Sequence, residues 1–254
     1  MKVPLSATLL IVLAAFCLPV AGQAQKKGTS ARSRPAATRS PEIGQTAVVI
    51  DETLSVLREK PSLYAASIQR MRRGRTIQIL GVAEADGVKF YRVTAPPSNF
   101  GWVQADAVFG KFRPADEERF ARLVQALSGF DQIETAVEFF NFYPASKFRP
   151  SILLLFGDLL EETAAKLSKD AGNRLKLKEM AASAAPTYSY FLNFVSLDRY
   201  RKLGITFVFN SAARQFHYDG ASWNEIVRKY PSSPETDEAK KRLETLKIKM
   251  EATK

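Results

Sequence analysis

The sequence predicts an α+β multidomain protein in which a small all-β barrel is followed by an all-α domain of helical hairpins. Two changes of pattern along the 254 residues support this prediction. Between residues 42 and 112, apolar and polar residues alternate and are interrupted by turn signals, which is typical of short strands. Between residues 113 and 254, apolar residues recur with a period of about 3.6, which is typical of packed helices.

The first 24 residues have the pattern of a secretory signal peptide. Lys2 precedes an apolar run from residue 5 to residue 20, and small residues follow where a peptidase would cut. The run is short for a bilayer span, and no later segment is long enough. Cys17, the only cysteine, would leave with this peptide because Phe16 before it does not fit a lipoprotein anchor. We therefore expect an exported bacterial protein, periplasmic, extracellular or associated with the cell envelope, without disulfides or a transmembrane segment.

The segment 25–41 is predicted to be a disordered basic linker. It is rich in Ser, Ala, Thr and Pro, and all its charged residues are basic: Lys26, Lys27, Arg32, Arg34 and Arg39. A flexible spacer is one interpretation, and an electrostatic tether to an anionic surface is the other. The formal net charge of the chain is +11. Nucleic acid is nevertheless not an expected partner, because the protein is predicted to be exported.

Strand and turn signals follow one another in the β region. Alternating residues at 76–80 and 88–93 predict two strands, joined by a tight turn at Asp86-Gly87. A third strand opens with Gly101-Trp102-Val103, and Val108-Phe109-Gly110 closes the unit. The close spacing of short strands predicts a barrel or sandwich.

This order of a strand ending in valine, a variable loop and Gly101-Trp102-Val103 resembles the bacterial SH3 family. The resemblance covers residues 42–112 and implies a small SH3-like barrel that binds a ligand and does not catalyse a reaction. Members that bind wall peptides use aromatic side chains and polar groups of loops, so the resemblance implies ligand-binding roles for Tyr64, Asn99 and Trp102. In the alternative interpretation Trp102 packs in the barrel core, as expected for Tyr91.

Four arginines form a basic turn in the same region: Arg70, Arg72, Arg73 and Arg75. Guanidinium groups at this density can contact an anionic polymer through carboxylates or phosphates. A solvated turn that discourages edge-to-edge strand pairing is the other interpretation.

The helical pattern starts after Pro114. Eight helices are expected, at about 116–127, 131–143, 150–167, 173–185, 188–195, 198–217, 221–229 and 234–249. The segment Ile205–Phe209 is also β-prone, so an extended segment is an alternative there.

A short pattern of residues is repeated within this helical region. Tyr143-Pro144 and Tyr230-Pro231 each close one helix, and two sets of residues share one spacing: Leu153, Phe156, Gly157 and Leu160, then Tyr200, Leu203, Gly204 and Phe207. The region therefore resembles a degenerate tetratricopeptide-like array, which implies stacked helix pairs. A short junction at 111–115 predicts that barrel and helices fold independently.

Residues that could support catalysis are few. The single histidine, His217, cannot form a polyhistidine zinc site, and no Cys-His pair is expected if Cys17 leaves with the signal peptide. His217 is interpreted as a helix cap or a packed core residue. Asp158, Glu161 and Glu162 are interpreted as a solvated, ion-paired helix face. We therefore expect no enzyme activity, no cofactor and no metal.

Binding is the remaining class of function. We expect an envelope binding or scaffold protein whose SH3-type module contacts a cell-wall peptide of peptidoglycan or another envelope protein. A structural subunit of an envelope complex that does not bind the wall is an alternative, and a wall hydrolase is a third.

Overall fold

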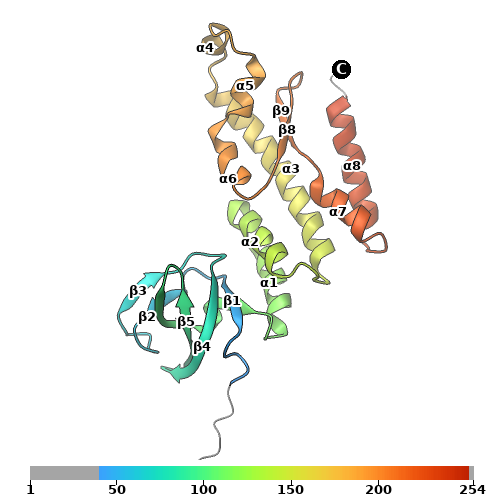
Figure 1. Cartoon of the computed structure of the whole chain (residues 1–254). Helices are drawn as coiled ribbons and strands as arrows, with labels where there is room; N and C mark the ends of the chain where they lie inside the picture. The colour runs from blue at the N-terminus through green and yellow to red at the C-terminus, as the bar shows by residue number, and fades with distance from the viewer. Residues whose placement is uncertain (1–39, 252–254) are drawn as a thin grey trace, which may run out of the picture. The chain divides into compact units, whose positions relative to one another are not determined.

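Seven strands come first in the part of the chain that the computed structural model describes, residues 40–251 (Figure 1). They are β1 (Thr46–Val49), β2 (Val56–Arg58), β3 (Ser67–Arg70), β4 (Thr76–Ala85), β5 (Val88–Ala95), β6 (Asn99–Gln104) and β7 (Val108–Gly110), with a short 3-10 helix at Ala105–Ala107. The predicted signal peptide and nearly all of the basic linker lie outside the described residues.

The strands form one antiparallel sheet with the order β3-β2-β6-β5-β4-β1-β7. Within this described sheet no pairing joins β3 to β7, so closure into a barrel is not seen. The predicted tight turn between β4 and β5 is confirmed: Asp86 and Gly87 both have positive φ, 55° and 72°. Two residues of this kind match the twist of a two-residue hairpin.

Helices dominate the rest of the described chain, so the α+β class is confirmed. They are α1 (Ala115–Ala126), α2 (Gly129–Phe142), α3 (Arg149–Arg174), α4 (Leu177–Ala181), α5 (Thr187–Leu192), α6 (Asp198–Arg201), α7 (Ala221–Lys229) and α8 (Thr236–Glu251), with a 3-10 turn at Val195–Leu197. The helix expected at 173–185 is wrong in its bounds, because α3 continues to Arg174 and only the short α4 follows.

The expectation of an all-α second part is also wrong. The segment predicted as one helix, 198–217, holds only α6 and then a hairpin of β8 (Phe207–Asn210) and β9 (Gln215–Tyr218). Gly204 ends the helical turn with a φ of 75°, a conformation that glycine adopts at helix ends. The β-prone alternative at Ile205–Phe209 is therefore confirmed in part.

Strand β1 explains how sheet and helices share a core. Its alternate residues Ala47 and Val49 belong to the core of the sheet. Val48 and the following Ile50 belong to the core that the helices build. The side chains of β1 therefore contact apolar neighbours on both faces, and core packing crosses the expected boundary between residues 112 and 113.

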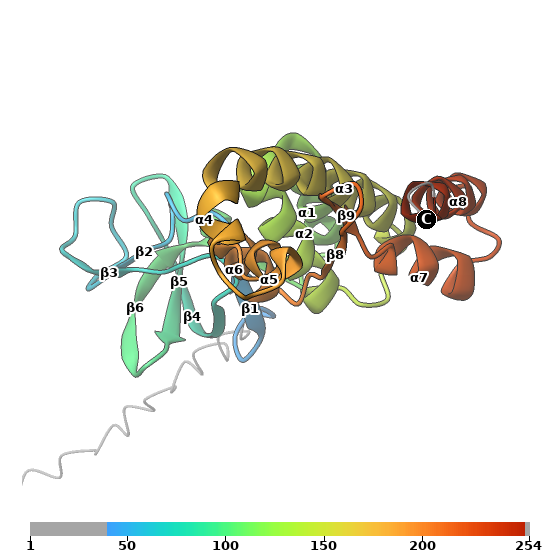
Figure 2. The ribbon, with the colours of Figure 1, turned by 90° about the horizontal axis from the view of Figure 1, so that it is seen from above.

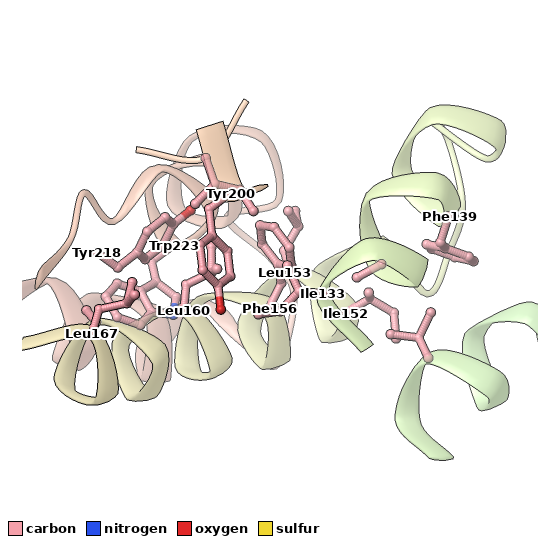
Figure 3. Close-up of a cluster of buried hydrophobic side chains, with 14 of the residues drawn as sticks. Ile133, Phe139, Ile152, Leu153, Phe156, Leu160, Leu167, Tyr200, Tyr218 and Trp223 are labelled. Carbon is pink, nitrogen blue, oxygen red and sulfur yellow. The ribbon is translucent and has the colours of Figure 1, made fainter. Parts of the chain in front are cut away.

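Helix α3 is the central element of the helical core (Figure 3). Leu153, Phe156 and Leu160, three of the residues that share the repeated spacing, are buried on this helix. Gly157 permits the close approach of α7, since a Cβ there would lie 2.7 Å from Ser222 Oγ and closer still to the indole of Trp223. The β8–β9 hairpin runs beside α3 in both ribbon views (Figures 1 and 2).

Candidate functional site

Trp102 lies on the face of β6 that is turned away from the core of the sheet. Its neighbours Gly101 and Val103 are buried, and Val103 belongs to that core, whereas Trp102 is half-buried. Because side chains alternate along a strand, Trp102 shares its face with Phe100, which is 57 % exposed. Tyr91 is fully buried in the core, as predicted.

Two arginines flank Trp102 across the sheet. Arg58 on β2 and Arg92 on β5 are its direct partners in the strand register. Directly opposite residues of antiparallel strands project to the same face, about 5 Å apart at Cβ. In the part of the chain described here, neither arginine forms an ion pair, and the buried Nε of Arg58 has no hydrogen-bond partner. The indole is therefore bordered by two cationic groups without carboxylate partners.

Tyr64 stands on the loop between β2 and β3, with 90 % of its surface exposed. Two contacts fix this loop to the sheet. Arg58 donates a hydrogen bond to the carbonyl of Ala65 (2.8 Å). At the β4–β5 turn, the Asp86 carboxylate accepts bonds from Ser62 Oγ (2.7 Å) and from the backbone N–H of Leu63 (2.8 Å).

These two bonds to Asp86 also lower the pKa of its carboxyl below the ordinary value, the Ser62 bond contributing most. The loop that carries Tyr64 is thus ordered by ionised Asp86 and by an arginine that borders Trp102.

Asn99 is placed away from this surface. It opens β6 three residues before Trp102, so its side chain projects to the opposite face. Its amide Nδ2 donates to Gln69 Oε1 of β3 at 3.0 Å. The structure therefore does not bring Asn99 and Trp102 together on one face.

Three arginines of the basic turn bind the protein's own backbone. Arg70 donates to the carbonyls of Glu52 and Thr53 (2.6 and 2.7 Å), and Arg75 donates to the carbonyl of Pro96 (2.7 Å).

Arg73 donates to the carbonyl of Ile50 (3.1 Å) and to Thr135 Oγ1 of α2 (3.0 Å). Arg72, like Arg70, is exposed. Most of the basic turn thus has structural hydrogen bonds.

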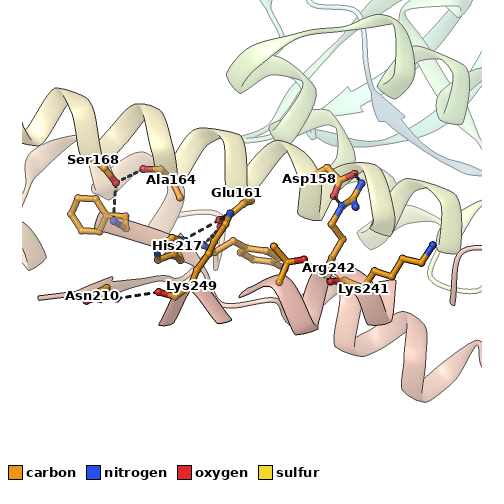
Figure 4. Close-up of polar contacts among 12 residues, drawn as sticks. Asp158, Glu161, Ala164, Ser168, Asn210, His217, Lys241, Arg242 and Lys249 are labelled. Carbon is orange, nitrogen blue, oxygen red and sulfur yellow. Dashed lines mark hydrogen bonds and ion pairs between the residues drawn. The ribbon is translucent and has the colours of Figure 1, made fainter. Parts of the chain in front are cut away.

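The polar cluster around Glu161 was not foreseen (Figure 4). Its carboxylate accepts hydrogen bonds from Lys249 Nζ (2.7 Å) and from the backbone N–H of Tyr218 (2.9 Å), and it lies 3.0 Å from His217 Nδ1. Burial alone would raise the pKa of this carboxyl, but these partners outweigh it and hold the pKa below its ordinary value.

The interpretation of Glu161 as part of a solvated helix face is therefore wrong. His217 is buried, but it lies in β9 and does not cap a helix, as one interpretation had it. The other two acids fit the ion-paired interpretation, since Asp158 pairs with Arg242 and Glu162 with Lys166.

Comparisons with known proteins give no relative. No protein-family model matches the chain, and searches of curated proteins and of solved structures find no match either. Within residues 40–251, no group of three or more His, Cys, Asp or Glu side chains is arranged to hold a metal ion. None of the described helices is long and apolar enough to cross a membrane.

Proposed function

We propose that the chain is an exported, non-enzymatic binding protein of the bacterial cell envelope, and that its sheet region is an SH3-type module. The residues grouped here as the Trp102 surface would bind a wall peptide, and they are exposed or half-buried: Arg58, Tyr64, Arg92, Phe100 and Trp102. The observation that carries this proposal is the indole between two arginines that lack carboxylate partners.

The chemistry of the Trp102 surface favours a short peptide with free carboxylates. Aromatic faces supply contact area at low entropic cost, and guanidinium groups bind carboxylates through paired hydrogen bonds. Arg92 is exposed and available to an incoming carboxylate. Tyr64, on a loop fixed by Asp86, adds an exposed aromatic ring to the set. Peptidoglycan stem peptides have these properties, since they are extended and carry free carboxylates.

Co-sedimentation of the signal-free chain with insoluble peptidoglycan tests the proposal. Arg92→Gln should weaken binding by roughly 10- to 100-fold, because a hydrogen bond to a charged group contributes about 1.5–3 kcal/mol. Arg228→Gln is the matched control, since Arg228 is an exposed arginine of α7 far along the chain. Equal binding by both variants would show that Arg92 does not contact the wall peptide.

Aromatic substitutions complete the test. Tyr64→Ala should weaken sedimentation, whereas Tyr188→Ala, which removes a 49 % exposed tyrosine of α5, should not. Trp102→Ala should weaken it most, with a melting temperature close to that of the parent, because the ring lies outside the core. Failure of the intact chain to sediment with the wall would contradict the proposal.

A protein partner is the second candidate. Strand β3 is at the edge of the sheet, and three of its four residues are exposed. An open edge of this kind can pair with a strand of another protein. In that case the chain would be a structural subunit of an envelope complex and would not bind the wall. Release of soluble muropeptides in the sedimentation assay would instead support a hydrolase.

A further inference from the structure

A cleft of about 410 Å³ lies between α3, the β8–β9 hairpin and α8. Its charged and titratable lining residues come from these three elements: Glu161 and Lys169 of α3, Arg214 and His217 of the hairpin, and Lys249 of α8. The proposed function uses none of them. They include three cations and one carboxylate, so the cleft has an excess of positive charge.

The single carboxylate, Glu161, is paired with Lys249 and therefore neutralises one of the three cations. Oε1 of Glu161 contacts His217 Nδ1 and accepts from Lys249 Nζ, while Oε2 accepts from the backbone N–H of Tyr218. In the described part of the chain, Lys169 and Arg214 form no ion pair. Two cations at the cleft are thus without a counter-ion.

His217 provides a directed polar group in the same cleft. Its side chain is 7 % exposed. An ionised carboxylate is only an acceptor, so Nδ1 of His217 carries a hydrogen and donates it to Glu161. This contact fixes the ring and leaves Nε2 as the nitrogen that can meet a ligand. Nε2 accepts a hydrogen bond when the ring is neutral and donates one when it is protonated.

We propose that this cleft binds a phosphate group, with His217 Nε2, Lys169 and Arg214 as its contacts. Donors from different elements surround a tetrahedral anion better than a planar one, and arginine and lysine both bind phosphate oxygens. A protonated imidazole adds a third donor. The site is separate from the Trp102 surface, so either can fail without the other.

The single histidine of the chain makes the test direct. In proton NMR of the full signal-free chain, the His217 ring resonances need no assignment by mutation, since there is one histidine. The pH midpoint of these resonances is measured with and without inorganic phosphate at constant ionic strength. The charged groups that line the cleft around the ring are Glu161, Lys169, Arg214 and Lys249, of which Glu161 contacts the ring directly.

Saturating phosphate should raise this midpoint, because the protonated ring binds the anion more tightly. A tenfold preference corresponds to a rise of about one pH unit. Glycerol phosphate should act like inorganic phosphate if the cleft accepts a phosphate ester, for instance a headgroup. If inorganic phosphate alone acts, the ligand is free phosphate.

Substitutions then test whether Lys169 and Arg214 are responsible for the rise of the His217 midpoint. The double variant Lys169→Gln with Arg214→Gln should abolish the rise, and Lys166→Gln, an exposed lysine of the same helix paired with Glu162, should preserve it. The proposal is overturned if phosphate leaves the midpoint unchanged, if chloride raises it equally, or if the double variant responds like the parent.

Discussion

Replacement of Gly157 by alanine is expected to destabilise the helical core although alanine is the better helix former. The new methyl group would lie 2.5 Å from Trp223 Cε2 and 2.7 Å from Ser222 Oγ. Trp223 is 1 % exposed, so the new methyl group would press on a buried ring. Overpacking of this kind costs about 1–3 kcal/mol. The gain in helix propensity recovers about 1 kcal/mol, which leaves a net loss of up to about 2 kcal/mol.

Gly172 provides the control within the same helix. It is exposed, and a Cβ there would meet no atom within 4 Å. Gly172→Ala should therefore stabilise the chain, by about 0.5–1 kcal/mol, through helix propensity alone. Urea unfolding of both variants, followed by far-UV circular dichroism, gives the two free energies of unfolding. If Gly157→Ala proves as stable as Gly172→Ala, the close approach of α3 and α7 is not as described.

Three further predictions concern the junction, the loop and the acid response. Phe109→Ala should cost about 3–5 kcal/mol and lower the unfolding midpoint of sheet and helices together, because this buried ring is in the helical core; separate transitions would speak against a shared core. Asp86→Gly should accelerate amide exchange at Leu63, which loses its acceptor, while the left-handed turn is kept; unchanged exchange would show that Asp86 does not hold the loop. Because its pKa is lowered in the folded state, ionised Glu161 contributes to stability at neutral pH, and this contribution is lost as the pH falls below 4.5. Glu161→Gln should therefore make the loss of stability in acid less steep. An equally steep loss in the variant would show that other groups cause the acid response.

Strands β4 and β5 could be predicted because the alternation of residues and the turn at Asp86-Gly87 are local signals. Strand β1 has no such alternation. Ala47, Val48, Val49 and Ile50 are all buried, which reads as a continuous apolar run. Which of them face the sheet and which face the helices depends on packing, and sequence spacing does not reveal it.

The hairpin β8–β9 was predicted as a helix because its aromatic residues fit both periods. Phe209 and Phe216 are paired across the hairpin, yet they also fall on one stripe at helical spacing. Short apolar runs of this kind cannot be assigned by periodicity alone. The positive φ of Gly204 and the packing of β9 against α3 favour the hairpin over a continuous helix.

The two arginines beside Trp102 and the Glu161 cluster were missed for another reason. Arg58 and Arg92 become neighbours of Trp102 only through the strand register. Glu161 and His217 are 56 positions apart. Contacts between distant positions have no signature in a single sequence, whereas the exposed position of Tyr64 followed from its place in a loop.

The use of both faces of β1 has a mechanical consequence. A load applied to the sheet would pass to α1 and α2 through the shared apolar core that contains Val48, Ile50 and Phe109. The same arrangement restricts recombination during evolution. Moved alone into another protein, the sheet would expose Val48, Ile50 and Phe109 to water and would need a new apolar surface to cover them.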